Sequence, residues 1–126
     1  MDTERFEKGL AQRKATLGPD YVARNLEAAD DLTRPFQEMI TEWCWGFGWA
    51  DEALDAKTRS LMNLAMIGAL GRMPEWEAHC KGALRNGCSR DEIRAAIHMV
   101  GIYCGVPAAV DCFRSARKVL EEAGEL

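Results

Sequence analysis

The chain of 126 residues has no long uninterrupted apolar segment. Its longest mostly apolar stretch runs from Leu61 to Gly71 and contains Asn63, whereas a helix that spans a bilayer needs about 20 such residues. The first residues, Met1 to Arg5, do not show the positive-then-apolar order of a secretory signal, and neither end carries a lipidation motif. We therefore expect a cytoplasmic protein that has no membrane partner.

An excess of basic residues is also absent. Sixteen Lys and Arg side chains stand against 20 Asp and Glu, which gives a net charge of −4. Without a broad positive surface, nucleic acid is not expected as a partner. The length suits one domain that buries roughly two-thirds of its unfolded surface. We predict a single domain over 1–126, with an N-terminal helical arm at 1–30 and a helical core at 33–123.

The cysteines do not form a recognisable framework. Their number is odd and no C-x-x-C spacing occurs among Cys44, Cys80, Cys88, Cys104 and Cys112. This pattern argues against a set of disulfides and against a zinc ribbon, and it favours free, mostly buried thiols. Glu75 and His79, four residues apart, would supply half of a metal site, but the chain has only two histidines and no evident third ligand. No metal is expected.

Alternating apolar patterns typical of strands are missing, and every segment between turn residues has a helical period. The sequence predicts an all-α fold of six to seven helices. The first begins near Thr3 and stops at Gly18-Pro19, and a short helix over 21–26 follows. Further helices are expected over 35–47, 58–71, 74–87 and 89–104, with a last one after Gly105-Val106-Pro107.

Local residues indicate where some of these helices begin and end. Thr33 is a candidate N-cap before Pro35, and Ser89 with Glu92 has the spacing of a capping box. The third helix should end within Gly46–Trp49, where two glycines permit a change of direction. The helix over 58–71 is apolar on almost every side, which favours burial against a second subunit as well as its own core.

Several short motifs occur in one order along the chain. They are Trp45-Gly46 with Trp49, Thr58-Arg59-Ser60-Leu61, Ala65-Met66, Leu70, His79, Asn86-Gly87, Arg90-Asp91-Glu92-Ile93 and Tyr103-Cys104-Gly105-Val106-Pro107-Ala108-Ala109. With this spacing the chain resembles the carboxymuconolactone decarboxylase family, in its gamma-carboxymuconolactone decarboxylase branch. The resemblance implies a compact helical bundle similar to alkyl hydroperoxidase D. It also implies a homo-oligomer, a trimer or a hexamer of paired trimers.

The resemblance further implies a decarboxylase that needs no cofactor and acts on a small carboxylated lactone or related acid in aromatic-compound catabolism. The protein must hold the carboxylate, stabilise the negative oxygen that forms as carbon dioxide leaves, and deliver a proton. His79 is the candidate proton donor or oxyanion partner. Arg59 and Arg72 are the candidates that hold substrate carboxylates. Alternatively, the histidine fills a helix contact and the arginines form surface ion pairs.

Other residues are expected to bind the substrate. Trp45, Trp49 and Tyr103 are candidates to wall an apolar pocket, unless these rings simply belong to the core. Ser60 stands at the position that matches a relay glutamate of the related hydroperoxidases and is included with them. His98, five residues before Tyr103, is a further candidate, with a surface or core position as the alternative.

Two departures from known patterns leave alternatives open. The hydroperoxidase branch carries C-x-x-C-x-x-x-H, but Arg72 and Glu75 occupy the cysteine positions before His79, which makes a thiol-dependent hydroperoxidase the weaker hypothesis. Close decarboxylases carry Glu and Arg where this chain has Phe47 and Asp51. These replacements should disfavour a polyanionic substrate, and they keep a non-catalytic oligomeric binding protein as an alternative.

Overall fold

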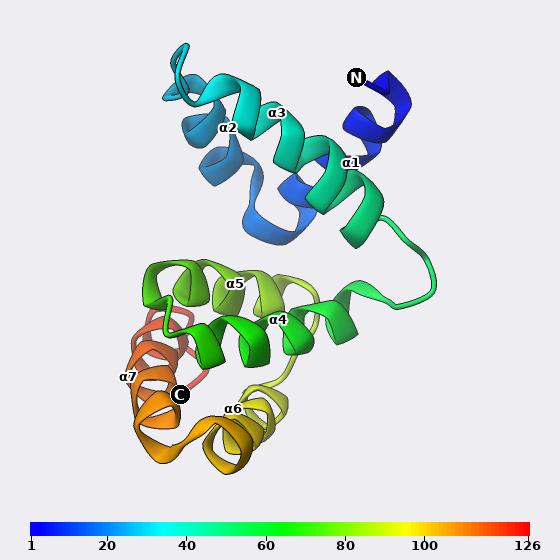
Figure 1. Ribbon diagram of the computed structural model, residues 1–126. Helices are drawn as coiled ribbons and strands as arrows, with labels where there is room; N and C mark the ends of the chain where they lie inside the picture. The colour runs from blue at the N-terminus through cyan, green and yellow to red at the C-terminus, as the bar shows by residue number, and fades with distance from the viewer. The chain divides into compact units, whose positions relative to one another are not determined.

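The computed structural model describes residues 1–126 and contains helices and no strand, which confirms the all-α prediction. The contacts divide the chain into two units, unit 1 over Met1–Ala56 and unit 2 over Lys57–Leu126. None of the helices combines the length and the apolar character required of a membrane span. The helices, coloured along the chain in Figure 1, are α1 (Thr3–Leu17), α2 (Pro19–Glu27), α3 (Arg34–Ile40), the π-helix η1 (Thr41–Trp49), α4 (Ala56–Leu70), α5 (Met73–Arg85), α6 (Arg90–Cys104) and α7 (Val106–Glu122).

Unit 1 is held together by close packing of α1 against η1. A Cβ atom added at Gly9 would lie only 1.9 Å from the carbonyl oxygen of Thr41, and one added at Gly46 would lie 2.2 Å from that of Arg5. Both positions therefore require glycine because the two backbones touch there. This contact gives the Gly46 of the Trp-Gly motif a structural role.

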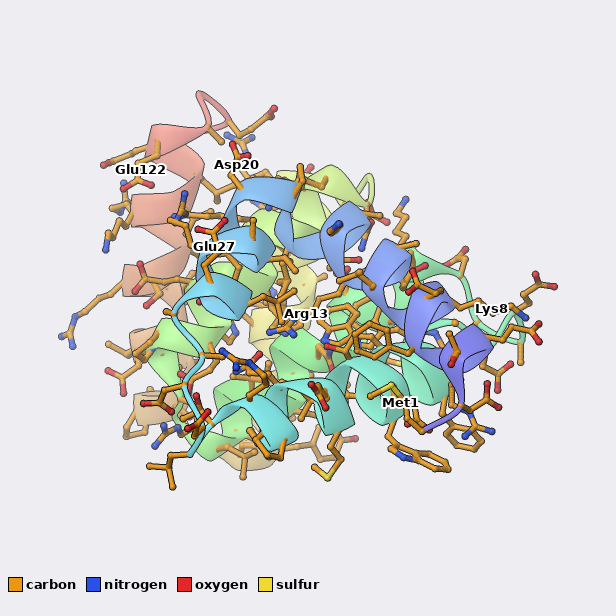
Figure 2. All side chains as sticks on the ribbon, turned by 90° about the horizontal axis from the view of Figure 1, so that it is seen from above. Met1, Lys8, Arg13, Asp20, Glu27 and Glu122 are labelled. Atoms are coloured by element: carbon orange, nitrogen blue, oxygen red, sulfur yellow. The ribbon has the colours of Figure 1, made fainter.

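A buried polar cluster joins the same helices of unit 1. Arg13, which points from α1 toward α3 in Figure 2, is buried and donates hydrogen bonds to Thr41 Oγ1 at 3.0 Å and Gln37 Oε1 at 2.8 Å. Arg5 forms an ion pair with Glu42, whose carboxylate lies 3.2 Å away. These pairings compensate for the removal of charged groups from water.

The start of α3 differs in detail from the prediction. Thr33 occupies the N-cap position, but its side chain makes no cap hydrogen bond to the helix. Its hydroxyl instead accepts from the backbone N–H of Asp30 and bonds the Asp30 carboxylate, each at 3.1 Å. The helix ends at Trp49 as expected, but its hydrogen bonding changes from α to π at Thr41, which the apolar period did not reveal.

Unit 2 consists of α4 to α7 around one apolar core. The Ser89 capping box is confirmed, because the Glu92 N–H donates to Ser89 Oγ at 3.0 Å and the Ser89 N–H donates to Glu92 Oε1 at 2.9 Å. Gly87 and Gly105 adopt φ values of 91° and 106° at the turns before α6 and α7. The core is formed by the buried side chains of Leu64, Trp76, Cys80, Ala83, Cys88, Ile93, Ile97, Val100, Ala109, Cys112, Ala116, Val119 and Leu120.

The apolar helix α4 buries only part of its surface within this chain. Its buried residues are Ser60, Leu64 and Gly68. Large apolar side chains elsewhere on α4 are exposed, at Met62, Met66 and Leu70. The chain thus leaves apolar area on α4 open to solvent, as the sequence indicated.

Candidate active site

The candidate site begins on the side of α5 that faces α4. Two hydrogen bonds tie these helices together, from Trp76 Nε1 to the carbonyl oxygen of Leu64 at 2.9 Å and from Asn86 Nδ2 to Ser60 Oγ at 3.0 Å. Residues three and four apart share one face of a helix. His79 lies between Trp76 and Asn86 at this spacing, so α5 directs it to the face that contacts α4.

Burial controls the charge of His79. The residue is half-buried, and its Nδ1 atom lies out of contact with solvent. Removal from water disfavours the charged imidazolium and lowers the pKa of His79 from 6.5 to about 4. The ring is therefore neutral at pH 7, where it offers an N–H donor and a lone pair. The neutral ring can stabilise an oxyanion by donating its N–H. Donation of a proton by imidazolium would require the charged form of the ring.

The two predicted carboxylate-binding arginines have different surroundings. Arg59, in the second turn of α4, is half-buried and its Nε atom is buried. Arg72 is exposed at the N-cap of α5, and its guanidinium lies 3.1 Å from the carboxylate of Glu75. An exposed pair of this kind contributes little to stability. A substrate carboxylate at Arg72 would have to compete with Glu75.

Three other predicted residues of unit 2 are spread over α4 and α6. Ser60 is fully buried and accepts the hydrogen bond from Asn86. His98 is exposed, with its ring centroid 6.0 Å from that of Phe113 on α7. Tyr103 is 79% exposed near the end of α6. Of these three side chains, Ser60 is the one that is hydrogen-bonded to α5, the helix that carries His79.

The two predicted tryptophans belong to unit 1. Trp45 and Trp49 are buried in η1, where their rings stack with centroids 4.8 Å apart. Trp49 also lines a cleft of about 900 Å³ whose carboxylates are those of Asp51, Glu52 and Asp55. Lys8 is the one basic side chain among the lining residues, so the cleft carries a net negative charge.

The thiols do not resemble those of a peroxidase. All five cysteines are free, and Cys80, Cys88 and Cys112 are buried. Burial is the main cause that raises the pKa of Cys80, beside His79 in sequence, to about 12. A thiol peroxidase needs a thiolate near neutral pH. No three His, Cys, Asp or Glu side chains are grouped so as to hold a metal ion.

The sequence patterns assigned no role to Asn86 or Arg117. Asn86 belongs to the Asn86-Gly87 motif, but its hydrogen bond to Ser60 depends on how α4 and α5 pack. Arg117 lines a groove between α6 and α7. Two arginine pairs, Arg90 with Arg94 and Arg114 with Arg117, have helical spacing. This spacing is the pattern in the sequence from which the basic groove could have been predicted.

Comparison with known proteins agrees with the motifs. The chain is 38% identical over 117 residues to the nitrosuccinic acid decarboxylase npaB of Metarhizium robertsii, an alignment that covers 93% of this chain and 82% of that protein. It is 34% identical over 123 residues to the 4-carboxymuconolactone decarboxylase of Acinetobacter baylyi, covering 98% and 92% of the two chains. The family model described as "Carboxymuconolactone decarboxylase family" matches residues 34–118. This chain therefore belongs to the carboxymuconolactone decarboxylase family.

Proposed function

We propose that this protein is a cofactor-free carboxy-lyase that acts on a small carboxylate able to delocalise the electron pair left by carbon dioxide. The names of two relatives that align over most of this chain support decarboxylation, since one is a nitrosuccinic acid decarboxylase and the other a 4-carboxymuconolactone decarboxylase. The observation that carries the proposal is the half-buried, neutral His79 on the face of α5 that contacts α4.

The two named substrates have one chemical feature in common. In each, an electron-accepting group can take up the electron pair of the broken carbon–carbon bond, the nitro group in one and the unsaturated lactone in the other. Carbon dioxide leaves, negative charge develops on an oxygen of the acceptor, and a proton then adds to carbon. The proposed role of His79 is to donate its N–H to that oxygen, which stabilises the transition state more than the ground state.

Arginines on α4 and at the start of α5 support the binding of an acid. Arg59 adjoins Ser60, which is linked to α5 through Asn86, and Arg72 precedes His79 by two turns of α5. In this proposal Arg59 and Arg72 hold carboxylates, Ser60 keeps α4 in place, and Tyr103 is a candidate substrate contact. Phe47 and Asp51, which replace Glu and Arg of the decarboxylase pattern, are expected to disfavour a polyanionic substrate.

We further propose that the protein is a cytoplasmic homo-oligomer, a trimer or a hexamer. Support comes from the apolar side chains of α4 that the chain leaves exposed, such as Met62 and Leu70. Covering such area in water is favourable at roughly 25 cal/mol per Å². Light scattering of the purified protein should give the mass of a trimer or hexamer, and a monomer at micromolar concentration would contradict this expectation.

The enzymatic proposal is tested by measuring carbon dioxide release from two substrates, 4-carboxymuconolactone and nitrosuccinate, without added metal or cofactor. Turnover of either supports the carboxy-lyase. Turnover of the lactone would place the protein in aromatic-compound catabolism, and turnover of nitrosuccinate alone would assign it a related acid. Binding of both compounds without carbon dioxide release would favour the non-catalytic binding protein and overturn the proposal.

A further inference from the structure

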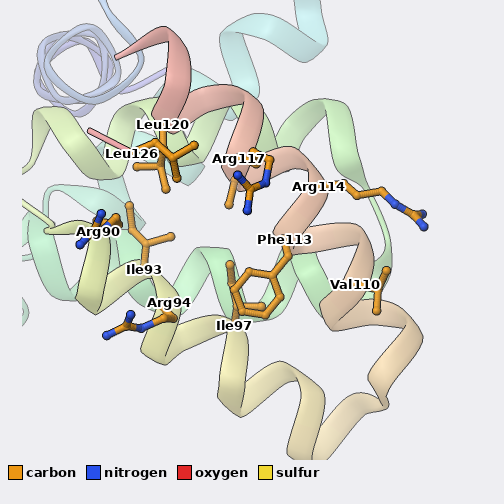
Figure 3. A pocket seen from close by; sticks show the side chains of 11 residues that line it. Arg90, Ile93, Arg94, Ile97, Val110, Phe113, Arg114, Arg117, Leu120 and Leu126 are labelled. Atoms are coloured by element: carbon orange, nitrogen blue, oxygen red, sulfur yellow. The ribbon is translucent and has the colours of Figure 1, made fainter. Parts of the chain in front are cut away.

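A groove between α6 and α7 has an apolar surface and a basic rim. Its volume is about 610 Å³, within the range of small-molecule sites. Seven apolar side chains and four arginines line it, and no carboxylate side chain does. This composition contrasts with the net charge of −4 of the whole chain. Figure 3 shows the lining residues, which are Arg90, Ile93, Arg94, Ile97, Val110, Phe113, Arg114, Ala116, Arg117, Leu120 and Leu126.

The four arginines differ in whether their charge is already compensated. The carboxylate of Asp91 lies 3.2 Å from the guanidinium of Arg94 and 3.8 Å from that of Arg90. Arg114 pairs with Asp111 at 3.5 Å, and in Figure 3 its side chain extends away from the groove. Both carboxylates belong to residues outside the lining of the groove.

Arg117 alone among the four makes neither an ion pair nor a side-chain hydrogen bond. Its guanidinium lies over the groove between Phe113 and Leu120 in Figure 3. A guanidinium presents a planar set of donors that matches a carboxylate. Near apolar groups such a contact is stronger than one in open water. Because Arg90 and Arg94 share the one carboxylate of Asp91, the four arginines and two aspartates leave the groove with excess positive charge. A guanidinium without a carboxylate partner over an apolar groove is complementary to an apolar molecule that carries a carboxylate.

We propose that the α6/α7 groove binds a small apolar monocarboxylate, whose carboxylate contacts Arg117 and whose hydrocarbon body packs on Ile93, Ile97 and Phe113. The exposure of Phe113, 40% in this structure, leaves ring surface for such a body to cover. None of the residues that line this groove is given a role in the proposed decarboxylation. The inference therefore does not depend on the proposed function.

A matched pair of probes tests the role of the charge. 1-Naphthaleneacetate and 1-naphthaleneacetamide have the same ring system, but only the first carries a negative charge. Isothermal titration calorimetry should show the acetate binding at least about tenfold more tightly than the amide, since hydrogen bonds to charged groups contribute more than neutral ones. Equal affinity of the two probes would overturn the proposal.

Variants locate the site. Arg117→Gln should remove the preference for the acetate, whereas Phe113→Ala should weaken both probes by a similar factor. Lys118→Gln is the matched control, because Lys118 follows on the same helix but pairs with Glu77 at 2.9 Å and does not line the groove. Affinities unchanged in Arg117→Gln, or lost equally in Lys118→Gln, would overturn the assignment.

Two further measurements separate this site from the candidate active site and from an interface between copies of the chain. His79→Leu should bind the acetate as the unaltered protein does, and Arg117→Gln should retain any decarboxylation measured for the unaltered protein. If a second copy of the chain fills the groove instead, neither probe will bind, and Arg117→Gln will change the mass in light scattering. That result would overturn the ligand site.

Discussion

Gly9→Ala is expected to lower the free energy of unfolding by about 3 kcal/mol or more, the upper range for overpacking. The added Cβ would lie 1.9 Å from the Thr41 carbonyl oxygen and 2.7 Å from the Gly46 nitrogen. Both are backbone atoms, so no side chain can rotate away to relieve the overlap. Urea unfolding followed by far-ultraviolet circular dichroism and tryptophan fluorescence gives the change directly.

Gly48→Ala is the matched control for that substitution. Gly48 also lies in η1, but an added Cβ would have the Trp43 carbonyl oxygen as its nearest neighbour, at 3.8 Å. The expected change in unfolding free energy is within about 1 kcal/mol, the range set by helix propensity alone. A loss of stability at Gly48 as large as that at Gly9 would show that the close contact of α1 and η1 is not the cause.

His79→Leu is expected to reduce kcat for carbon dioxide release by roughly 10²–10³, the effect of removing one oxyanion donor. His79→Gln retains an N–H donor in a side chain without an imidazole. If the neutral ring acts by donating to the developing oxyanion, the Gln variant should keep part of the activity that the Leu variant loses. Both rates are measured on whichever substrate the unaltered protein decarboxylates.

The control for these variants is His98→Gln. His98 is the second of the two histidines of the chain and is exposed, so its replacement should leave kcat within about threefold, a difference of roughly 0.7 kcal/mol in the barrier. Equal, complete loss in the Gln and Leu variants at position 79 would indicate proton transfer by the imidazole instead. Full activity in both would remove His79 from the mechanism.

Features that depend on local sequence were predicted well. The capping box of Ser89 and Glu92 requires only two residues three positions apart at the first turn of a helix, where backbone N–H groups need acceptors. The structure contains both of its hydrogen bonds. The end of α1 before Gly18-Pro19 and the break before α7 likewise follow from glycine and proline positions. Thr33 failed as a cap because Asp30, three residues earlier, competes for its hydroxyl.

Features that depend on packing were not predictable from the pattern. The π-helix of η1 accompanies a contact in which Gly9 and Gly46 let two backbones touch, and no period in the sequence encodes that partner. Arg13, which the sequence patterns did not single out, is buried against Gln37 and Thr41. In both cases the residues that decide the structure lie more than 20 positions apart.

The candidate site shows the same division. His79 was proposed from its place among the motifs of the family to which this chain belongs. Its lowered pKa follows from burial, which the arrangement of the surrounding helices sets and the sequence does not state. The resemblance to the family also gave no role to Asn86. Its hydrogen bond to Ser60 connects α4 with the end of α5, the helix that carries His79.

The lowered pKa also couples His79 to stability. Its value in the folded protein, about 4, lies below the ordinary 6.5 of an unfolded chain, so the unfolded state binds more protons between these values. The contribution of His79 to stability is therefore complete above pH 6.5 and is lost as the pH falls toward 4. Urea unfolding of the unaltered protein should show this loss, and His79→Leu should lack it.

The mechanism rests on an imidazole at position 79 that is uncharged when substrate binds. Nuclear magnetic resonance of protein labelled with ¹³C at histidine Cε1 measures this charge directly, and His98→Gln identifies the resonance of His79 by removing the other. We predict that the His79 resonance titrates with a pKa of about 4 and does not shift between pH 6 and 8. A midpoint near 6.5, the ordinary value, would contradict the account.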